Sequence, residues 1–105
     1  GEKIVEAILD LVRAFRPETT EASAPVRAAI SWGPGPRAAQ ALMLSVRAQA
    51  LLDGRLAPSL ADVATLAGPV LSHRMALSFA ARARGESLSG LIAQVTRDVL
   101  RQEAA

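Results

Sequence analysis

Cysteine and tyrosine are absent from this chain of 105 residues, and histidine and tryptophan occur once each. Without cysteine the chain can form neither a disulfide nor a catalytic thiolate. The single histidine, His73, argues against a zinc site and has no partner set for acid–base or nucleophilic catalysis. We therefore expect no metal site, and we expect that the chain is not an enzyme on its own.

Long apolar runs are also missing. None approaches the roughly 20 residues that cross a membrane as a helix. The first residues, GEKIVEAIL, lack the basic start and the long apolar stretch of a signal peptide. These two absences predict a cytoplasmic protein with no membrane span.

The chain is instead rich in aliphatic residues: 50% of its residues are hydrophobic, but only 3% are aromatic. Small aliphatic side chains favour closely packed helices over a β-sandwich. A length of 105 residues fits one domain over 1–105, with a core of modest size. The fold class that we predict is mainly α, a small bundle of four to five helices.

Apolar residues recur at helical spacing in four segments, 2–16, 36–53, 60–68 and 88–100. The segment 36–53 is apolar almost all the way round, which predicts a central helix that is buried on most sides. Its polar edge is narrow. Gly54 is expected to end this helix in the left-handed conformation.

The third of these helices carries its own start and stop signals. Ser59 and Asp62 have the spacing of a capping box. Gly68 is expected to end the helix, and Pro69 to start a short further turn that runs to about Arg74. In that turn His73 is expected to cap a helix end or to pack against it.

Two segments predict a short two-stranded β pairing. Within the long connection 17–34, residues 26–32 alternate between apolar and polar side chains. Residues 75–85, MALSFAARARG, alternate in the same way over part of their length, and a short strand there could pair with 26–30. Trp32 is expected to anchor the core beside the glycine turn that follows it.

Positive charge is concentrated in the middle of the chain. The net charge of the whole chain is +2, whereas residues 23–85 contain seven arginines against only Asp53 and Asp62. Such a segment could face an anionic partner, or it could be a solvated arginine surface. The charge alone leaves both interpretations open.

The stretch SWGPGPRAAQAL places Arg37 in an unusual position. Pro36 suits the first position of a helix, because its missing N–H needs no partner there. Arg37 then lies in the first turn, where the helix dipole disfavours a cation. A helix start with free N–H groups and an added guanidinium can hold a phosphate. Gly35, Pro36 and Arg37 are therefore the candidate binding residues, although a plain surface arginine would fit the same position.

The same stretch resembles a known family. WGPGPRAAQALMLSVRAQALLDGR, followed by SLADVATLAGPVLSHRMALSF, is similar to the C-terminal helical lid of MoxR-type AAA+ ATPases. The family pattern is a G-x-[SG]-P-R-A turn that opens a helix, then an LLDGR end, a D-V-x-x-L-A helix and an HR pair. The resemblance runs from about Ile4 to Leu100. The chain departs from commoner members at Pro34 and Gly35, where Ala-Ser is frequent.

The resemblance implies a function for Arg37. It matches the sensor-2 arginine, which in this family reaches the terminal phosphates of ATP, so ATP is the cofactor expected for the complete protein. The phosphate loop, the Mg²⁺-binding acid and the arginine finger would belong to a larger α/β domain preceding Gly1. The isolated chain is therefore expected to bind no cofactor. Its expected work is to close over ATP and to couple hydrolysis to the remodelling or activation of partner proteins.

The resemblance also implies the partners. These are the chain's own N-terminal ATPase domain, neighbouring subunits of a hexameric ring, and a client protein that carries a metal-dependent adhesion domain. Two alternatives stay open. One is a free-standing helical module that binds an acidic partner through the arginine-rich middle segment. The other is a DNA-binding module, but the second helix is too apolar to lie in a groove, so no nucleic-acid partner is expected.

Overall fold

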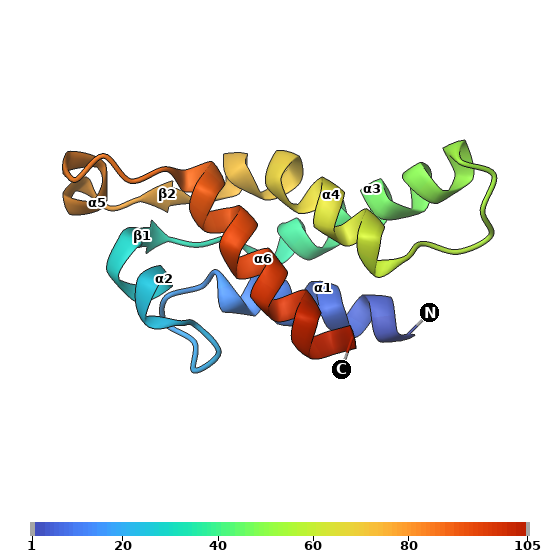
Figure 1. Cartoon of the computed structure of the whole chain (residues 1–105), viewed down its shortest axis with the longest axis horizontal. Helices are drawn as coiled ribbons and strands as arrows, with labels where there is room; N and C mark the ends of the chain where they lie inside the picture. The colour runs from blue at the N-terminus through green and yellow to red at the C-terminus, as the bar shows by residue number, and fades with distance from the viewer. Residues whose placement is uncertain (1, 105) are drawn as a thin grey trace.

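Four long helices form the body of the protein, and a small sheet with two short helices extends it at one end (Figure 1). The computed structural model describes residues 2–104 and measures 44 × 24 × 21 Å along its principal axes. The long helices are α1 (Glu2–Ala14), α3 (Pro36–Leu52), α4 (Leu60–Leu71) and α6 (Leu88–Ala104). The shorter elements are α2 (Ala24–Ala29), β1 (Ile30–Trp32), the 3-10 helix η1 (Ser72–Arg74), β2 (Ala76–Leu77) and α5 (Phe79–Ala83). The predicted fold class, a mainly α bundle with one short β pairing, is confirmed.

One row of apolar side chains on each long helix makes the core. In α3 and α4 the buried residues recur four apart, which keeps them on one face because the helix turns once in about 3.6 residues. Alanines in these rows let the helices approach closely, and α1 and α6 close the core from the other side. The core residues of these four helices include Ile8, Leu11, Ala38, Leu42, Val46, Val63, Ala67, Leu71 and Ile92.

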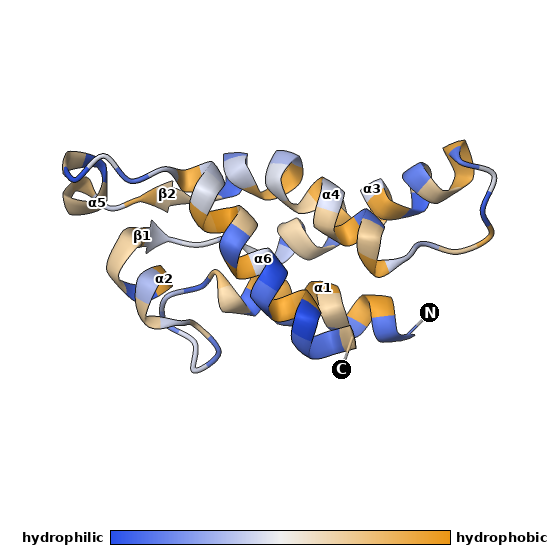
Figure 2. Cartoon of the chain, viewed as in Figure 1, coloured by the Kyte–Doolittle hydropathy of each residue, from blue (hydrophilic) through white to orange (hydrophobic). Residues whose placement is uncertain are grey.

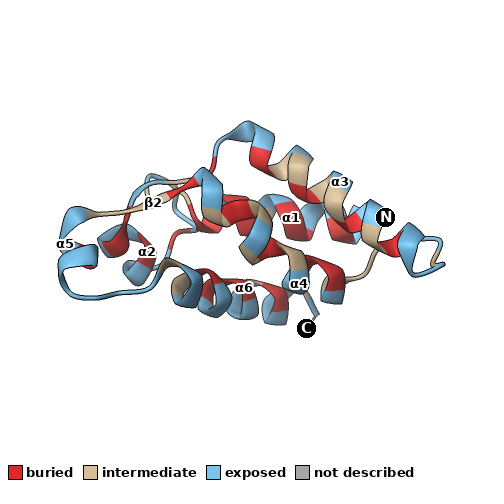
Figure 3. Ribbon diagram, turned by 90° about the horizontal axis from the view of Figure 1, so that it is seen from above, coloured by how far each residue is buried: buried red, intermediate tan, exposed pale blue. Residues whose placement is uncertain are grey.

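The prediction that α3 is buried on most sides is wrong. Only its row of Ala38, Leu42, Val46 and Ala50 is buried, and the opposite face is exposed. Figure 3 shows buried, intermediate and exposed residues following one another along this helix. The physical reason is that α3 packs on α4 and α1 along one face only. Ala39 and Met43 are half-buried at the edge of this face, whereas the leucines of the outer face are not covered within residues 2–104.

Several leucines therefore face outward. Leu44 is 65% exposed, and Leu51 and Leu52 at the end of α3 are 74% and 82% exposed. Figure 2 shows this end of α3 in hydrophobic colour although it projects from the body of the molecule. Large apolar side chains that gather on a surface are typical of an interface with another part of a protein. Helix α3 is therefore a core helix on one face and exposes leucines on the other.

Helix α4 does not end at Gly68 as predicted. It continues through Pro69 to Leu71, and η1 follows directly. Proline removes one N–H donor from a helix and usually ends or kinks it. Here Ala67 and Leu71 are fully buried, so core packing on both sides of Pro69 holds the last turn in helical form.

The predicted β pairing is confirmed, but both strands are shorter than expected. Strands β1 and β2 are antiparallel, with Ile30 opposite Leu77 and Trp32 opposite Ala76. The alternation seen over 26–32 is mostly helical, because α2 occupies Ala24–Ala29 and buries Val26 and Ala29. After β2 the chain turns into α5, whose first turn is capped by the Ser78 hydroxyl oxygen accepting from the Ala81 N–H at 3.1 Å.

The connection from α3 to α4 is held by Arg55. Gly54 adopts the left-handed conformation that was predicted, with φ of +74°. Arg55 then donates from both terminal nitrogens to the two carboxylate oxygens of Asp62, each at 2.8 Å. The Asp62 carboxylate also accepts from the Ser59 N–H at 2.8 Å, which completes the predicted capping box at the start of α4. These bonds join the two helices that contact each other most extensively.

The ion pair between Arg55 and Asp62 makes the stability of the fold depend on pH at low pH. Arg55, followed by the backbone of Ser59, lowers the pKa of Asp62 from 3.8 to about 2. Between these two values the unfolded chain binds the proton and the folded chain does not, so the free energy of unfolding falls as the pH drops through that range. Above pH 3.8 the full contribution of the ion pair is present.

We expect Asp62→Asn to lower the stability at neutral pH and to flatten its decrease between pH 3.8 and about 2. Urea unfolding followed by circular dichroism across this range measures both effects. Asp98→Asn, which changes an exposed carboxylate of α6, is the control and should keep the wild-type pH dependence. An Asp62→Asn curve that runs parallel to wild type would show that the ion pair does not carry the acid sensitivity.

Candidate functional site

The loop from β1 to α3 is pressed against the end of α1. A Cβ atom on Gly33 would lie 2.5 Å from the Phe15 carbonyl oxygen and 2.9 Å from the Arg16 Cα. Both contacts are with backbone, which cannot turn aside as a long side chain can. Pro34, the next residue, is fully buried. The loop is therefore fixed in place on the core side, immediately before the candidate binding residues.

Helix α3 starts directly after this fixed loop. Gly35 is its N-cap residue, in extended backbone with no side chain to cap the helix, and Pro36 occupies the first turn. Arg37 follows on the exposed side of that turn. Across residues 2–104 its guanidinium makes no hydrogen bond or ion pair. The structure thus keeps the three predicted site residues contiguous, with an open helix start and an unpaired cation pointing to the outside.

The expected polar edge of α3 also exists. Gln40 and Arg47 are exposed like Arg37, but Arg47 lies ten residues further along, about 15 Å at 1.5 Å per residue. Arg37 and Arg47 therefore cannot contact the same small anion. Of the two, only Arg37 stands beside the free N–H groups at the start of the helix.

Trp32 and His73 do not lie where the sequence predicted. Trp32 was expected in the core but is 56% exposed. The aromatic ring that fills the core below the glycine turn is Phe15, which is fully buried. His73, expected to cap or pack at a helix end, is exposed in η1.

The structure adds a groove that the sequence did not predict. A cavity of about 460 Å³ runs between α1 and α3, and Val5, Leu9, Met43 and Leu44 form much of its apolar lining. Gln40 and Arg47 lie at its rim. The sequence signal for this groove is the wide apolar pattern of α3, which by itself predicts burial within the chain.

The described residues offer two features that could bind another molecule, the start of α3 and the α1–α3 groove. Within residues 2–104 no group of three or more histidine, aspartate or glutamate side chains could hold a metal ion. No helix of this region is long and apolar enough to cross a bilayer. The start of α3 can bind an anion through backbone N–H groups and Arg37, and the α1–α3 groove can accept an apolar surface.

Comparison with known proteins gives two matches. Residues 22–101 match the family described as the AAA lid domain. The structure is similar to the crystal structure of a candidate ATPase from Cytophaga hutchinsonii, with a TM-score of 0.86 and 28% sequence identity. This similarity covers 92% of the present chain but only 29% of the chain of that ATPase. No curated protein matches the sequence.

The close contact of Gly33 with Phe15 and Arg16 can be tested by substitution. We expect Gly33→Ser to lower the free energy of unfolding by about 2 kcal/mol or more, because its Cβ would overlap backbone atoms of Phe15 and Arg16, which directly follow α1. A loss of this size should lower the melting temperature by about 8 °C or more in a domain of this length. Thermal unfolding followed by circular dichroism measures the effect.

Gly35→Ser is the matched control for this experiment. A Cβ on Gly35 meets no atom within 4 Å, and a serine at this N-cap position can accept a bond from the helix. Its stability should be unchanged or a few tenths of a kcal/mol higher. If both substitutions had the same effect, the close approach to α1 would not be what positions the loop.

Proposed function

The chain belongs to the AAA lid domain family, and on this premise we propose that it is the C-terminal helical lid of a MoxR-type AAA+ ATPase. The match to the family includes the loop and the whole of α3, where the candidate residues lie. The finer assignment is supported by the order of short motifs from Gly33 to Arg74. In this proposal residues 1–105 are one domain of a longer ATPase.

Arg37 is the proposed sensor-2 residue. The observation that carries this assignment is that Arg37 is exposed and unpaired in the first turn of α3, directly after a loop that Gly33 fixes against α1. A guanidinium at the positive end of a helix is unfavourable when no anion is bound. A nucleotide phosphate would remove this repulsion and would accept from both the planar fork and the helix N–H groups. Gly35 and Pro36 contribute by leaving the helix start open.

In the complete ATPase the chemistry of hydrolysis belongs to other residues. ATP would be bound with Mg²⁺ by an N-terminal domain that supplies the phosphate loop and the acidic ligand. The present chain would contribute the arginine, exclude water from one side of the nucleotide and move with the nucleotide state. The similar ATPase has room for such a domain, because the present chain corresponds to 29% of its length.

The exposed apolar surfaces support a lid that contacts other domains. The α1–α3 groove and the outward face of α3, with Leu44 and Leu51, are too apolar for a surface that only meets water. We propose that the partners are the chain's own ATPase domain and neighbouring subunits of a hexameric ring. Hydrolysis in that ring would act on a client protein, for which a metal-dependent adhesion domain is the proposed class.

The isolated chain should neither hydrolyse ATP nor bind it tightly, because the start of α3 provides a single cation, Arg37, and residues 2–104 provide no metal-ligand cluster. Phosphate release and titration calorimetry with Mg-ATP on purified protein test this expectation. Nucleotide-dependent phosphate release that persists through further purification would contradict it.

The central test is Arg37→Ala in the full-length ATPase. Turnover of ATP should fall about a hundredfold, since removing a cation that faces developing phosphate charge commonly costs ~3 kcal/mol of barrier. The isolated domain with the same substitution should melt at the same temperature or slightly higher, because the helix dipole no longer meets a cation. Arg37→Lys should recover only part of the activity, since an ammonium does not replace a planar fork.

Arg97→Ala is the control, because Arg97 is exposed on α6, away from the start of α3 and from the α1–α3 groove. It should leave turnover close to wild type. If Arg37→Ala unfolds the isolated domain, Arg37 is a structural residue. If turnover falls with Arg47→Ala and not with Arg37→Ala, the phosphate contact belongs to Arg47.

A further inference from the structure

Two of the three aromatic side chains of this protein are exposed at the same end of the molecule. Phe79 at the start of α5 is 83% exposed and Trp32 at the end of β1 is 56% exposed, whereas Phe15 is fully buried. Two exposed arginines, Arg74 in η1 and Arg82 in α5, accompany them. We call Trp32, Arg74, Phe79 and Arg82 the aromatic–arginine end.

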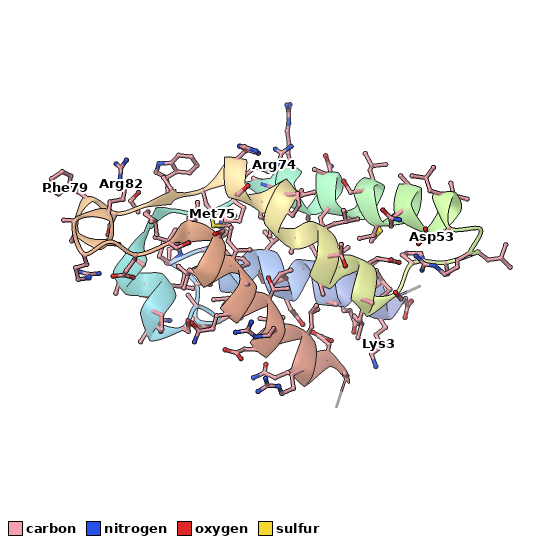
Figure 4. The ribbon with its side chains drawn as sticks, turned by 45° about the horizontal axis from the view of Figure 1, so that its top comes forward. Lys3, Asp53, Arg74, Met75, Phe79 and Arg82 are labelled. Carbon is pink, nitrogen blue, oxygen red and sulfur yellow. The ribbon has the colours of Figure 1, made fainter. Side chains whose placement is uncertain are left out.

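The small sheet brings these residues together. Trp32 pairs with Ala76, which lies two residues after Arg74 and three before Phe79. In Figure 4 the side chains of Phe79, Arg82 and Arg74 lie along one edge of the molecule and point away from the ribbon. The Ser78 N–H donates to the Ala29 carbonyl oxygen at 2.6 Å, so α5 is tied to α2 beside the sheet. The four side chains therefore stand on a defined support.

The exposed ring of Phe79 is not needed to hold α5 in place. Helix α5 is already capped by Ser78 and is held to the body by Ala81, which is fully buried. Phe79 lies on the outside of this short helix, where a polar residue would serve the fold as well. Tryptophan, phenylalanine and arginine are the residue types enriched in protein interfaces, and paired aromatic and arginine side chains often carry the binding energy.

The arginines here are available to a partner. Within the described part of the chain, Arg74 and Arg82 form no ion pair, whereas their neighbour Arg84 is bound to Glu86 at 2.6 Å. The surrounding sequence also lacks carboxylates, since residues 22–52 and 63–85 contain no aspartate or glutamate. Every element of this end is built from these two segments. The aromatic–arginine end is therefore positively charged, and its own segments contain no carboxylate to pair with Arg74 and Arg82.

We infer that the aromatic–arginine end binds an acidic polypeptide segment in which an apolar side chain lies between carboxylates. The apolar side chain packs on Phe79 and Trp32, and the carboxylates pair with Arg74 and Arg82, each through a planar fork. A nucleic acid fits less well, because it presents a long row of phosphates and needs a broad basic surface. This end offers two unpaired arginines, which match a short acidic segment.

The aromatic–arginine end and the loop between α3 and α4 lie at opposite ends of the molecule. Figure 1 shows α5 and the sheet at one end of the molecule and the loop between α3 and α4 at the opposite end. That loop exposes Leu56 completely. Leu56 therefore provides a matched control for Phe79, because each is an exposed apolar side chain and the two lie at opposite ends of the molecule.

The inference is tested by measuring how the 105-residue chain binds labelled peptides. One peptide alternates aspartate and glutamate with leucine, and a second carries asparagine and glutamine in place of the acids. We expect saturable binding of the acidic peptide by fluorescence anisotropy, and no binding of the neutral one. Trp32 is the sole tryptophan, so its fluorescence should change on binding and report that the contact is at this end.

Variants locate the contact. Arg74→Gln combined with Arg82→Gln should weaken binding of the acidic peptide roughly tenfold or more, since both charge-assisted pairs are lost. Arg97→Gln combined with Arg101→Gln removes the same charge from α6 and should have little effect. Phe79→Ser should weaken binding several-fold, and Leu56→Ser should not. Circular dichroism confirms that each variant is folded.

Three results would overturn the inference. The first is equal weakening by the two arginine pairs, which would indicate attraction to net charge alone. The second is tighter binding to a single-stranded oligouridylate or to anionic phospholipid vesicles than to the acidic peptide, which would assign this end to a different ligand. The third is the absence of saturable binding to the acidic peptide while Trp32 fluorescence stays unchanged.

Discussion

The close approach of Gly33 to the backbone of Phe15 and Arg16, just after α1, is the contact on which the rest of the site depends. It leaves no space for a side chain between the loop and the Phe15 carbonyl oxygen. The contact holds the backbone between β1 and the first turn of α3. If an anion binds there, only the exposed side chain of Arg37 has to be ordered.

Arginine serves two different purposes in this protein, and the difference lies in its neighbours. Arg55 is bound to Asp62 through both terminal nitrogens and joins α3 to α4, so it is part of the fold. Arg37, Arg74 and Arg82 have no such acid near them, because the segments that carry them contain none. Unpaired arginines on rigid supports are ready to bind anions or carboxylates, whereas the paired one contributes to stability.

The apolar residues divide in the same way. A single row on each long helix is enough to fill the core of a domain this small, so the other apolar residues of α3 remain outside. For a protein that works alone this would be an aggregation risk. For a lid that lies against an ATPase domain and moves with it, an outer apolar face is a requirement. The exposed leucines and the α1–α3 groove are thus consistent with a domain that acts as part of a larger protein.

The sequence by itself determined the features that depend on neighbours along the chain. The left-handed Gly54, the capping box of Ser59 and Asp62 and the place of Arg37 in the first turn of α3 are all local, and all were predicted. Only the tertiary structure decided which face of α3 is buried, that α4 passes through Pro69, and that Trp32 lies outside while Phe15 fills the core. An apolar pattern shows that a residue can be buried, but the packing of distant helices determines whether anything covers it. The aromatic–arginine end depends on the same rule, since the pairing of β1 with β2 places Trp32 between Arg74 and Phe79, more than forty residues away in sequence.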